Sequence, residues 1–286
     1  MANLKEIRNR ISSIGSTMKI TSAMKMVSAA KLKKASDAIV QMRPYSNKLT
    51  ELLQNLSATL DSDDGGVYTE EREVKKVLIV AITSNRGLCG GFNSAVVKEV
   101  IQLAKTKYAG KEVSVFSIGK KGNDLLSKEF DIFQFESELF DHLTFENTAP
   151  FAQILMDEFE KGSYDQIDLV YNRFKNAATQ IMTTEQFLPI VSSDEVSDNN
   201  TDYIFEPNKA EIVQGLIPKS LKMQLFKALR DSYAAEHGAR MTAMHKATDN
   251  ATELRDDLLL AYNKARQAAI TNEILEIVGG AEALNN

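Results

Sequence analysis

Two long helical patterns, one at each end of the chain, constrain the fold more than any other feature of this sequence. Residues 3–58 contain a single proline, Pro44, and residues 219–286 contain none. The sequence with β-strand character lies between these two segments. At about 1.5 Å of rise per residue, the C-terminal segment alone would reach roughly 100 Å, which is too long for the core of a globular domain. The two ends therefore predict an extended helical shaft.

Both terminal segments carry apolar residues at the three- and four-residue steps of a coiled coil. The N-terminal seam changes phase once, which indicates a stutter, and it opens with Leu4, Ile7, Ile11, Ile14 and Met18. In the C-terminal segment, nine of the ten seam positions from Met244 to Leu275 are apolar, and five are alanine. We therefore predict an antiparallel coiled coil with closely spaced helices. Pro44 is expected to kink or break its helix, because proline removes a backbone donor and clashes with the preceding turn.

The middle of the chain changes to strands alternating with helices. Apolar runs of strand length occur at 77–83, 113–118, 131–135, 167–171 and 179–188. Helical patterns separate the first four runs, at about 93–108, 121–129 and 148–161. Strands that are apolar on both faces indicate a three-layer, Rossmann-like α/β domain with a mostly parallel sheet.

The predicted fold class is therefore α/β, with a long antiparallel coiled coil and an inserted α/β domain. We expect the coiled-coil shaft at residues 1–60 and 208–286, and the inserted domain at residues 74–206. Pro207 and Pro218 are expected to bracket the return from the domain to the second helix.

Charge is distributed unevenly along the chain. The net charge of −5 argues against a general nucleic-acid binder. Residues 1–43 nevertheless hold nine basic and two acidic side chains, a net charge of +7, so the remainder carries −12. The basic segment is either a solvated helix face or a contact surface for an acidic partner.

The residues give no support for catalysis or for cofactor binding. The glycines after the first strand, at 87, 90 and 91, do not form G-x-G-x-x-G, and no phosphate-binding G-x-x-x-x-G-K-[ST] occurs. Cys89 is the only cysteine, which excludes a disulfide framework and a cysteine-based zinc site. The three histidines, His142, His237 and His245, lack metal-ligand spacing. We therefore predict no catalytic residue, no metal, no cofactor and no directly bound nucleotide.

The sequence predicts neither a membrane-spanning segment nor a cleavable leader. No apolar run reaches the about 18 residues needed to span a bilayer. The helical pattern begins within the first few residues, so we expect no cleavable leader, and the single cysteine fits a reducing compartment.

Several segments form distinctive motifs, among them Thr-Met-Lys-Ile-Thr-Ser-Ala-Met-Lys-Met-Val at 17–27 and Asn-Arg-Gly-Leu-Cys-Gly-Gly-Phe-Asn at 85–93, with others at 7–11, 239–244, 247–251, 262–268 and 270–283. Together these motifs resemble the gamma subunit family of rotary ATP synthases. The resemblance runs from end to end. One departure is Asn85, where the family usually has aspartate, so a role that needs a negative charge there is not supported.

The resemblance implies a central rotor shaft that transmits torque during ATP synthesis or hydrolysis and does no bond chemistry. The coiled coil would turn inside a ring of alpha and beta subunits, and the α/β domain would lie beside the epsilon subunit on the membrane rotor ring. The enzyme would be bacterial and lie at the cytoplasmic face of the inner membrane. The chloroplast form's regulatory cysteine pair is absent, because Cys89 stands alone.

The resemblance also implies a set of partner contacts. Contacts with acidic loops of the beta subunits would involve Met24, Lys25, Lys31, Lys33, Arg86, Gly87 and Leu88. Contacts with the rotor ring would involve Tyr203 and Glu206. Further contacts would involve Arg266, Gln267, Thr271 and Glu276, and the tip would turn in an apolar collar through Ile277 and Val278.

Two other functions fit the bare pattern of helices and strands. A coiled-coil scaffold with an inserted α/β domain would resemble the arms of chromosome-organising ATPases, but those proteins need a phosphate-binding loop near the N-terminus, and the sequence has none. A nucleotide-dependent α/β enzyme with helical dimerisation arms would bind ATP or NAD tightly, which a shaft does not require.

Overall fold

The computed structural model describes residues 4–57, 67–70, 72–190 and 209–284. Its elements are α1 (Leu4–Ser57), η1 (Val67–Thr69), β1 (Lys76–Ile82), α2 (Phe92–Lys105), β2 (Glu112–Ile118), α3 (Lys120–Leu126), β3 (Asp131–Glu136), α4 (Phe145–Glu160), β4 (Gln166–Phe174), β5 (Gln180–Leu188) and α5 (Lys209–Leu284). The chain divides into two compact units, which we describe separately. The sheet unit comprises residues 28–240, and the helix-pair unit comprises residues 1–27 and 241–286.

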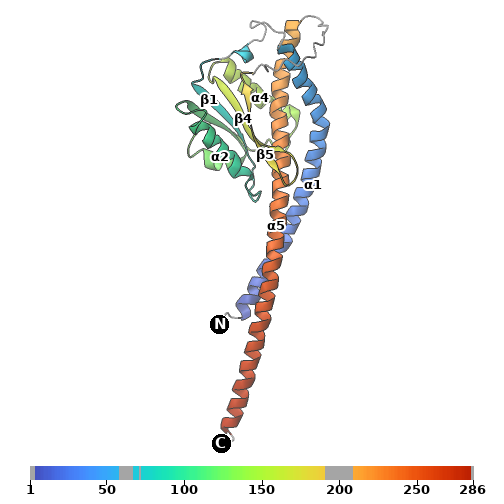
Figure 1. The fold of residues 1–286 in the computed structure, drawn as a ribbon, viewed down its shortest axis with the longest axis vertical. Helices are drawn as coiled ribbons and strands as arrows, with labels where there is room; N and C mark the ends of the chain where they lie inside the picture. Colours follow the sequence, from blue (N-terminus) through green and yellow to red (C-terminus); the bar gives the residue numbers. More distant parts are fainter. Residues whose placement is uncertain (1–3, 58–66, 71, 191–208, 285–286) are drawn as a thin grey trace. The chain divides into compact units, whose positions relative to one another are not determined.

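The sheet unit contains one five-stranded sheet in the order β3-β2-β1-β4-β5. The first four strands are parallel, and β5 runs antiparallel to β4 at one edge. The mostly parallel sheet predicted from the apolar runs is thereby confirmed. In chain order the sheet lies between the two long helices α1 and α5, as the sequence predicted, and Figure 1 shows the strands beside α5.

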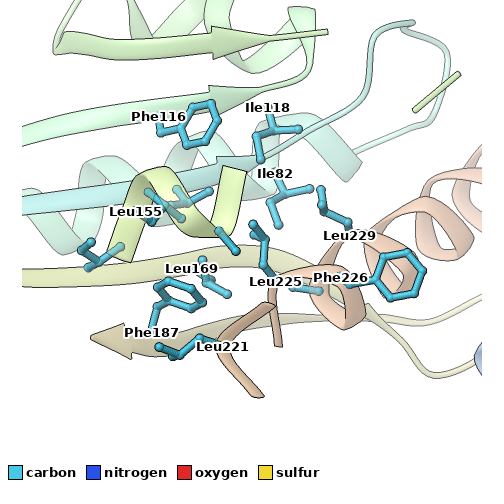
Figure 2. Packing of buried hydrophobic residues seen from close by; sticks show 14 of the residues in the cluster. Ile82, Phe116, Ile118, Leu155, Leu169, Phe187, Leu221, Leu225, Phe226 and Leu229 are labelled. Atoms are coloured by element: carbon cyan, nitrogen blue, oxygen red, sulfur yellow. The ribbon is translucent and has the colours of Figure 1, made fainter. Parts of the chain in front are cut away.

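Helices cover both faces of this sheet, which gives three layers. On one face, Val96 and Val100 of α2 pack on the alternate β1 side chains Val77 and Ile79. On the other face, Figure 2 shows side chains of α4 and α5 meeting the strands, among them Leu155 and Leu225. Burying each such side chain contributes about 1.5–3 kcal/mol. The long helix α5 therefore serves as one of the covering helices of the sheet.

The two long helices pack against each other inside each unit. In the sheet unit, Ala35 and Ile39 of α1 are buried against Ala234 of α5. In the helix-pair unit, the hydroxyls of Thr21 and Thr248 lie 2.8 Å apart. Residue numbers that rise along α1 meet residue numbers that fall along α5, so the pairing is antiparallel, as predicted.

The structure corrects two of the proline predictions: α1 is not broken at Pro44, and Pro218 does not mark the start of a helix, while Pro207 lies outside the described residues. Pro44 lies inside α1, which continues to Ser57, and Pro218 lies inside α5, which begins at Lys209. Buried side chains on either side of Pro44, Ile39 and Leu49, hold that part of the helix in place. Tertiary packing of this kind can offset the roughly 3 kcal/mol that proline costs inside a helix.

The predicted C-terminal seam is longer than the surface that α1 covers. The guanidinium of Arg8 donates to the hydroxyl of Tyr262 at 2.8 Å, near the start of α1. From Tyr262 to Leu284, α5 continues for about 33 Å. The seam residue Leu275 is 62% exposed, so the regular spacing continues beyond the helix that it was expected to pair with. The predicted boundaries of shaft and inserted domain stay a prediction.

Candidate partner-contact site

The loop between β1 and α2, residues 83–91, projects an apolar side chain into solvent. Leu88 is 64% exposed. Its backbone φ of 62° lies in the left-handed region, which residues other than glycine seldom adopt. The neighbouring Cys89 is 2% exposed and packs with Phe92 and Ala235. Two neighbouring residues of the loop therefore differ in burial: Cys89 is packed inside the protein, and Leu88 points into solvent.

Side chains of the loop and of α2 hold the backbone of this loop. The Ser84 hydroxyl donates to the carbonyl oxygen of Arg86 at 2.7 Å. The amide of Asn93 accepts from the Ser84 backbone N–H at 2.9 Å and donates to the sulfur of Cys89 at 3.3 Å. Burial raises the pKa of the Cys89 thiol, which keeps it protonated and unreactive. We therefore interpret Cys89 as a structural residue that packs the loop against α2 and α5.

A second anchor comes from α5. The guanidinium of Arg240 donates to the carbonyl of Arg86 at 3.0 Å and to that of Gly87 at 3.3 and 3.4 Å. It also donates to the carboxylate of Glu236 at 2.6 Å. Arg240 and Glu236 are both buried, and burial raises the pKa of Glu236 while Arg240 opposes that rise.

The surroundings of this ion pair are also buried. The ring of His237 makes an edge contact with Tyr233 at 4.5 Å, and its Nδ1 lies 3.4 Å from Arg240. Burial, with the nearby charge of Arg240, lowers the pKa of His237 to about 3, so the imidazole is neutral at physiological pH. Glycine suits position 238, because a Cβ there would lie only 3.2 Å from the backbone of Ala177 in the β4–β5 turn.

The place that α5 occupies is where open α/β sheets usually bind ligands. In a doubly wound sheet, ligands lie beyond the carboxyl ends of the strands where the strand order reverses, here between β1 and β4. Ala235 packs at this point with Phe92 and with Phe174 at the end of β4. The segment after β1 thus packs against α5 at this point.

Asn85 uses both ends of its side-chain amide. Its Nδ2 donates to the carbonyl of Ser137, and its Oδ1 accepts from the backbone N–H of Lys120 at 3.1 Å. An ionised aspartate could make only the second of these bonds, because it has no donor. The departure from the family pattern at this position therefore has a structural consequence.

The predicted contact residues of α1 fall in both units. In the helix-pair unit, Met24 and Lys25 are half-buried, and the Lys25 ammonium lies 3.3 Å from Nδ1 of His245. In the sheet unit, Lys31 and Lys33 are exposed. The structure therefore places all four residues on α1, two in each unit.

The predicted contact residues of α5 lie on its uncovered end. Residues 266–281 are all exposed, including Arg266, Gln267, Thr271 and Glu276. Ile277 is 65% exposed and Val278 is 55% exposed. Tyr203 and Glu206 lie outside the described residues.

The side chains described above hold the loop backbone and the buried charges in place. Within the described ranges, no group of three metal-ligating side chains comes together. None of the described helices is both long enough and apolar enough to cross a bilayer.

Sequence reasoning missed the contact of Arg240 with Arg86 and Gly87, because these residues lie far apart in the chain. The available signal was a Glu236–Arg240 pair at helical spacing in a segment rich in alanine and glycine.

Comparisons with known proteins agree with the resemblance at the level of the whole chain. Residues 3–284 match the family model described as ATP synthase. The ATP synthase gamma chain of Flavobacterium johnsoniae is 71% identical over 286 residues, covering 100% of both chains. That of Flavobacterium psychrophilum is 70% identical, covering 99% of both.

Solved structures are similar in fold. A chain in the central stalk/c-ring structure of the Tetrahymena thermophila mitochondrial ATP synthase has a TM-score of 0.62 at 26% identity, covering 80% of this chain and 99% of that one. A chain in the Euglena gracilis mitochondrial enzyme, in an OSCP/F1/c-ring structure, has a TM-score of 0.72 at 23% identity, covering 98% of this chain and 94% of that one. The latter likeness concerns the fold alone. The chain therefore belongs to the family of ATP synthase gamma chains, the non-catalytic subunit that forms part of the enzyme's central stalk.

Proposed function

We propose that this chain is the rotor shaft that carries torque between an ion-driven membrane ring and the catalytic alpha/beta ring. The observation that carries the proposal is the end of α5, where residues 266–281 are helical and exposed on every side. Ile274, Leu275, Ile277 and Val278 are each more than half exposed there. Apolar surface of this extent usually marks an interaction site.

Weak apolar contacts suit a surface that must turn against a surrounding collar. Van der Waals contacts have no preferred direction, so no strong hydrogen bond has to break at each step. A shaft that presents different faces to equivalent catalytic sites would favour a different conformation at each one. Torque would then act by shifting conformational populations, with no bond chemistry in this chain.

We assign the other predicted contacts to the same function. The exposed Lys31 and Lys33, with Met24 and Lys25, would meet acidic loops of the beta subunits, together with Arg86, Gly87 and Leu88. Tyr203 and Glu206 would rest on the membrane rotor ring. The epsilon subunit would lie beside the sheet unit.

The bacterial relatives favour a location at the cytoplasmic face of the bacterial inner membrane, where the chain would be held by the complex. The absence of a span among the described helices fits attachment through other subunits. The proposal includes no nucleic acid and no directly bound nucleotide.

Two charges placed at the tip test this function. The Ile277→Glu, Val278→Glu variant should lower assembly or ion pumping per ATP about tenfold, because the carboxylates would enter an apolar collar without partners. The matched control is Ile277→Leu with Val278→Leu, which keeps the surface apolar and should behave like the parent. Rotation and ion pumping are measured together on the reconstituted complex. A glutamate variant that assembles and couples like the parent would rule out an apolar bearing at the tip.

A further inference from the structure

The side chain of Arg240 connects α5 by hydrogen bonds to the loop that presents Leu88. Arg240 is 7% exposed, and its guanidinium donates to two successive carbonyls, those of Arg86 and Gly87. Leu88 follows directly, with its φ of 62° and its side chain 64% exposed. The arginine therefore fixes the backbone immediately before an outward, left-handed residue.

This geometry depends on the chemistry of arginine. Arg240 uses Nε and Nη2 on the loop and Nη1 on Glu236, so the planar fork serves both contacts at once. A lysine ammonium is a single point of charge and cannot span these acceptors in the same way. Glu236 in turn fixes the guanidinium, because a buried charge needs a partner of opposite sign.

We propose that Arg240 is a positioning residue, which, held by Glu236, sets the loop conformation that presents Arg86 and Leu88 to a partner subunit. The inference rests on the proposed function, because it assumes that the loop touches a partner. The inference adds the buried Arg240 to the residues proposed for this contact, as one that acts through the loop and not by touching the partner. A buried ion pair that served stability alone would leave the loop conformation unchanged when an uncharged pair of similar size replaced it.

The single cysteine provides a direct probe of the loop. Cys89 lies next to Leu88, is 2% exposed, and is the only cysteine in the chain. Its rate of reaction with a thiol reagent therefore reports how often the loop opens. The test variant is Glu236→Gln with Arg240→Met, which removes both charges and keeps similar volume, so the fold should persist. The matched control is Arg230→Met, an arginine on the same helix that packs over Phe226 and does not bond to the loop.

In the full-length chain, Cys89 should react about tenfold faster in the double variant than in the parent, because the loop loses three charge-assisted hydrogen bonds. The urea midpoint should stay near that of the parent, and Arg230→Met should change neither quantity. Arg240→Lys should give an intermediate rate. A parent-like rate in the double variant would overturn the inference.

In the reconstituted complex, the double variant should lower ion pumping per ATP by as much as Leu88→Ala does. Combining the two changes should add little, because both act through the same contact. Additive losses would overturn the positioning role. If Leu88→Ala itself couples like the parent, the loop touches no partner and the inference fails, while the shaft function, tested at Ile277 and Val278, is left standing.

Discussion

The side-chain amide of Asn85 makes two hydrogen bonds, and one of them depends on its nitrogen atom, Nδ2. Its Nδ2 donates to the Ser137 carbonyl while its Oδ1 accepts from Lys120 N–H. In Asn85→Asp the carboxylate oxygen would face the carbonyl oxygen, and the free energy of unfolding should fall by about 1–3 kcal/mol at pH 8. Urea unfolding of the full-length chain measures this loss.

The pH dependence of Asn85→Asp distinguishes this cause from a change in packing. A protonated aspartic acid can donate to the Ser137 carbonyl, so the folded state should raise the pKa of the new carboxyl group. Its stabilising contribution is then present at low pH and is lost as the pH rises through the raised value. The deficit relative to the parent should therefore shrink toward pH 4, and an equal deficit at pH 4 and pH 8 would contradict this account.

Asp231 is a carboxyl group of the natural chain whose pKa is raised in the folded state. It is 3% exposed, its Oδ1 has no hydrogen-bond partner among the described residues, and burial raises its pKa from 3.8 to about 6. The folded state thus favours the protonated acid, and this contribution is lost as the pH rises through 6. Asp231→Asn, which cannot ionise, should gain about 2–3 kcal/mol in the free energy of unfolding over the parent between pH 4 and pH 8.

Urea midpoints at several pH values check the prediction for Asp231. The control is Ser232→Ala, which changes the next buried polar side chain without changing a titrating group, and which should shift the midpoint equally at each pH. A constant difference between Asp231→Asn and the parent would show that Asp231 stays charged in the folded state.

At the scale of elements, the basic part of α1 is the clearest test of an electrostatic contact. Replacing Lys25, Lys31 and Lys33 with glutamine should lower ion pumping per ATP about threefold, with additive single effects, because exposed charge contacts are individually weak. The matched control replaces three exposed lysines of the sheet unit, Lys98, Lys105 and Lys111, and changes the net charge equally. Equal coupling in the two triple variants would show that the face of α1 carries no specific contact.

The elements themselves could largely be predicted from the sequence, because apolar periodicity records which faces are buried. The strand predicted at 113–118 is β2 (Glu112–Ile118), and its runs on both faces reflect helices above and below. Pro44 and Pro218 could not be placed correctly, because the local cost of a proline says nothing of the packing that offsets it.

The candidate site was predicted only in part. The outward residues Arg86 and Leu88 came from the resemblance, and the structure places both in solvent. Arg240 was missed because its contact with Arg86 joins residues that are distant in sequence, and a single sequence gives no measure of such pairs. The contacts themselves stay predictions, because they depend on surfaces of other chains.

At the scale of the whole molecule, the uncovered end of α5 has a consequence for the life of the newly made chain. An isolated helix without a packed face is only marginally stable in water, and an apolar one also favours self-association. Chaperones and proteases act on such surfaces, so the half-life of the unassembled subunit depends on how soon other subunits enclose Ile274 to Val278. The residues that we propose as a bearing in the finished machine would thereby limit how much of the free subunit accumulates, and they would tie its abundance to the supply of its partners.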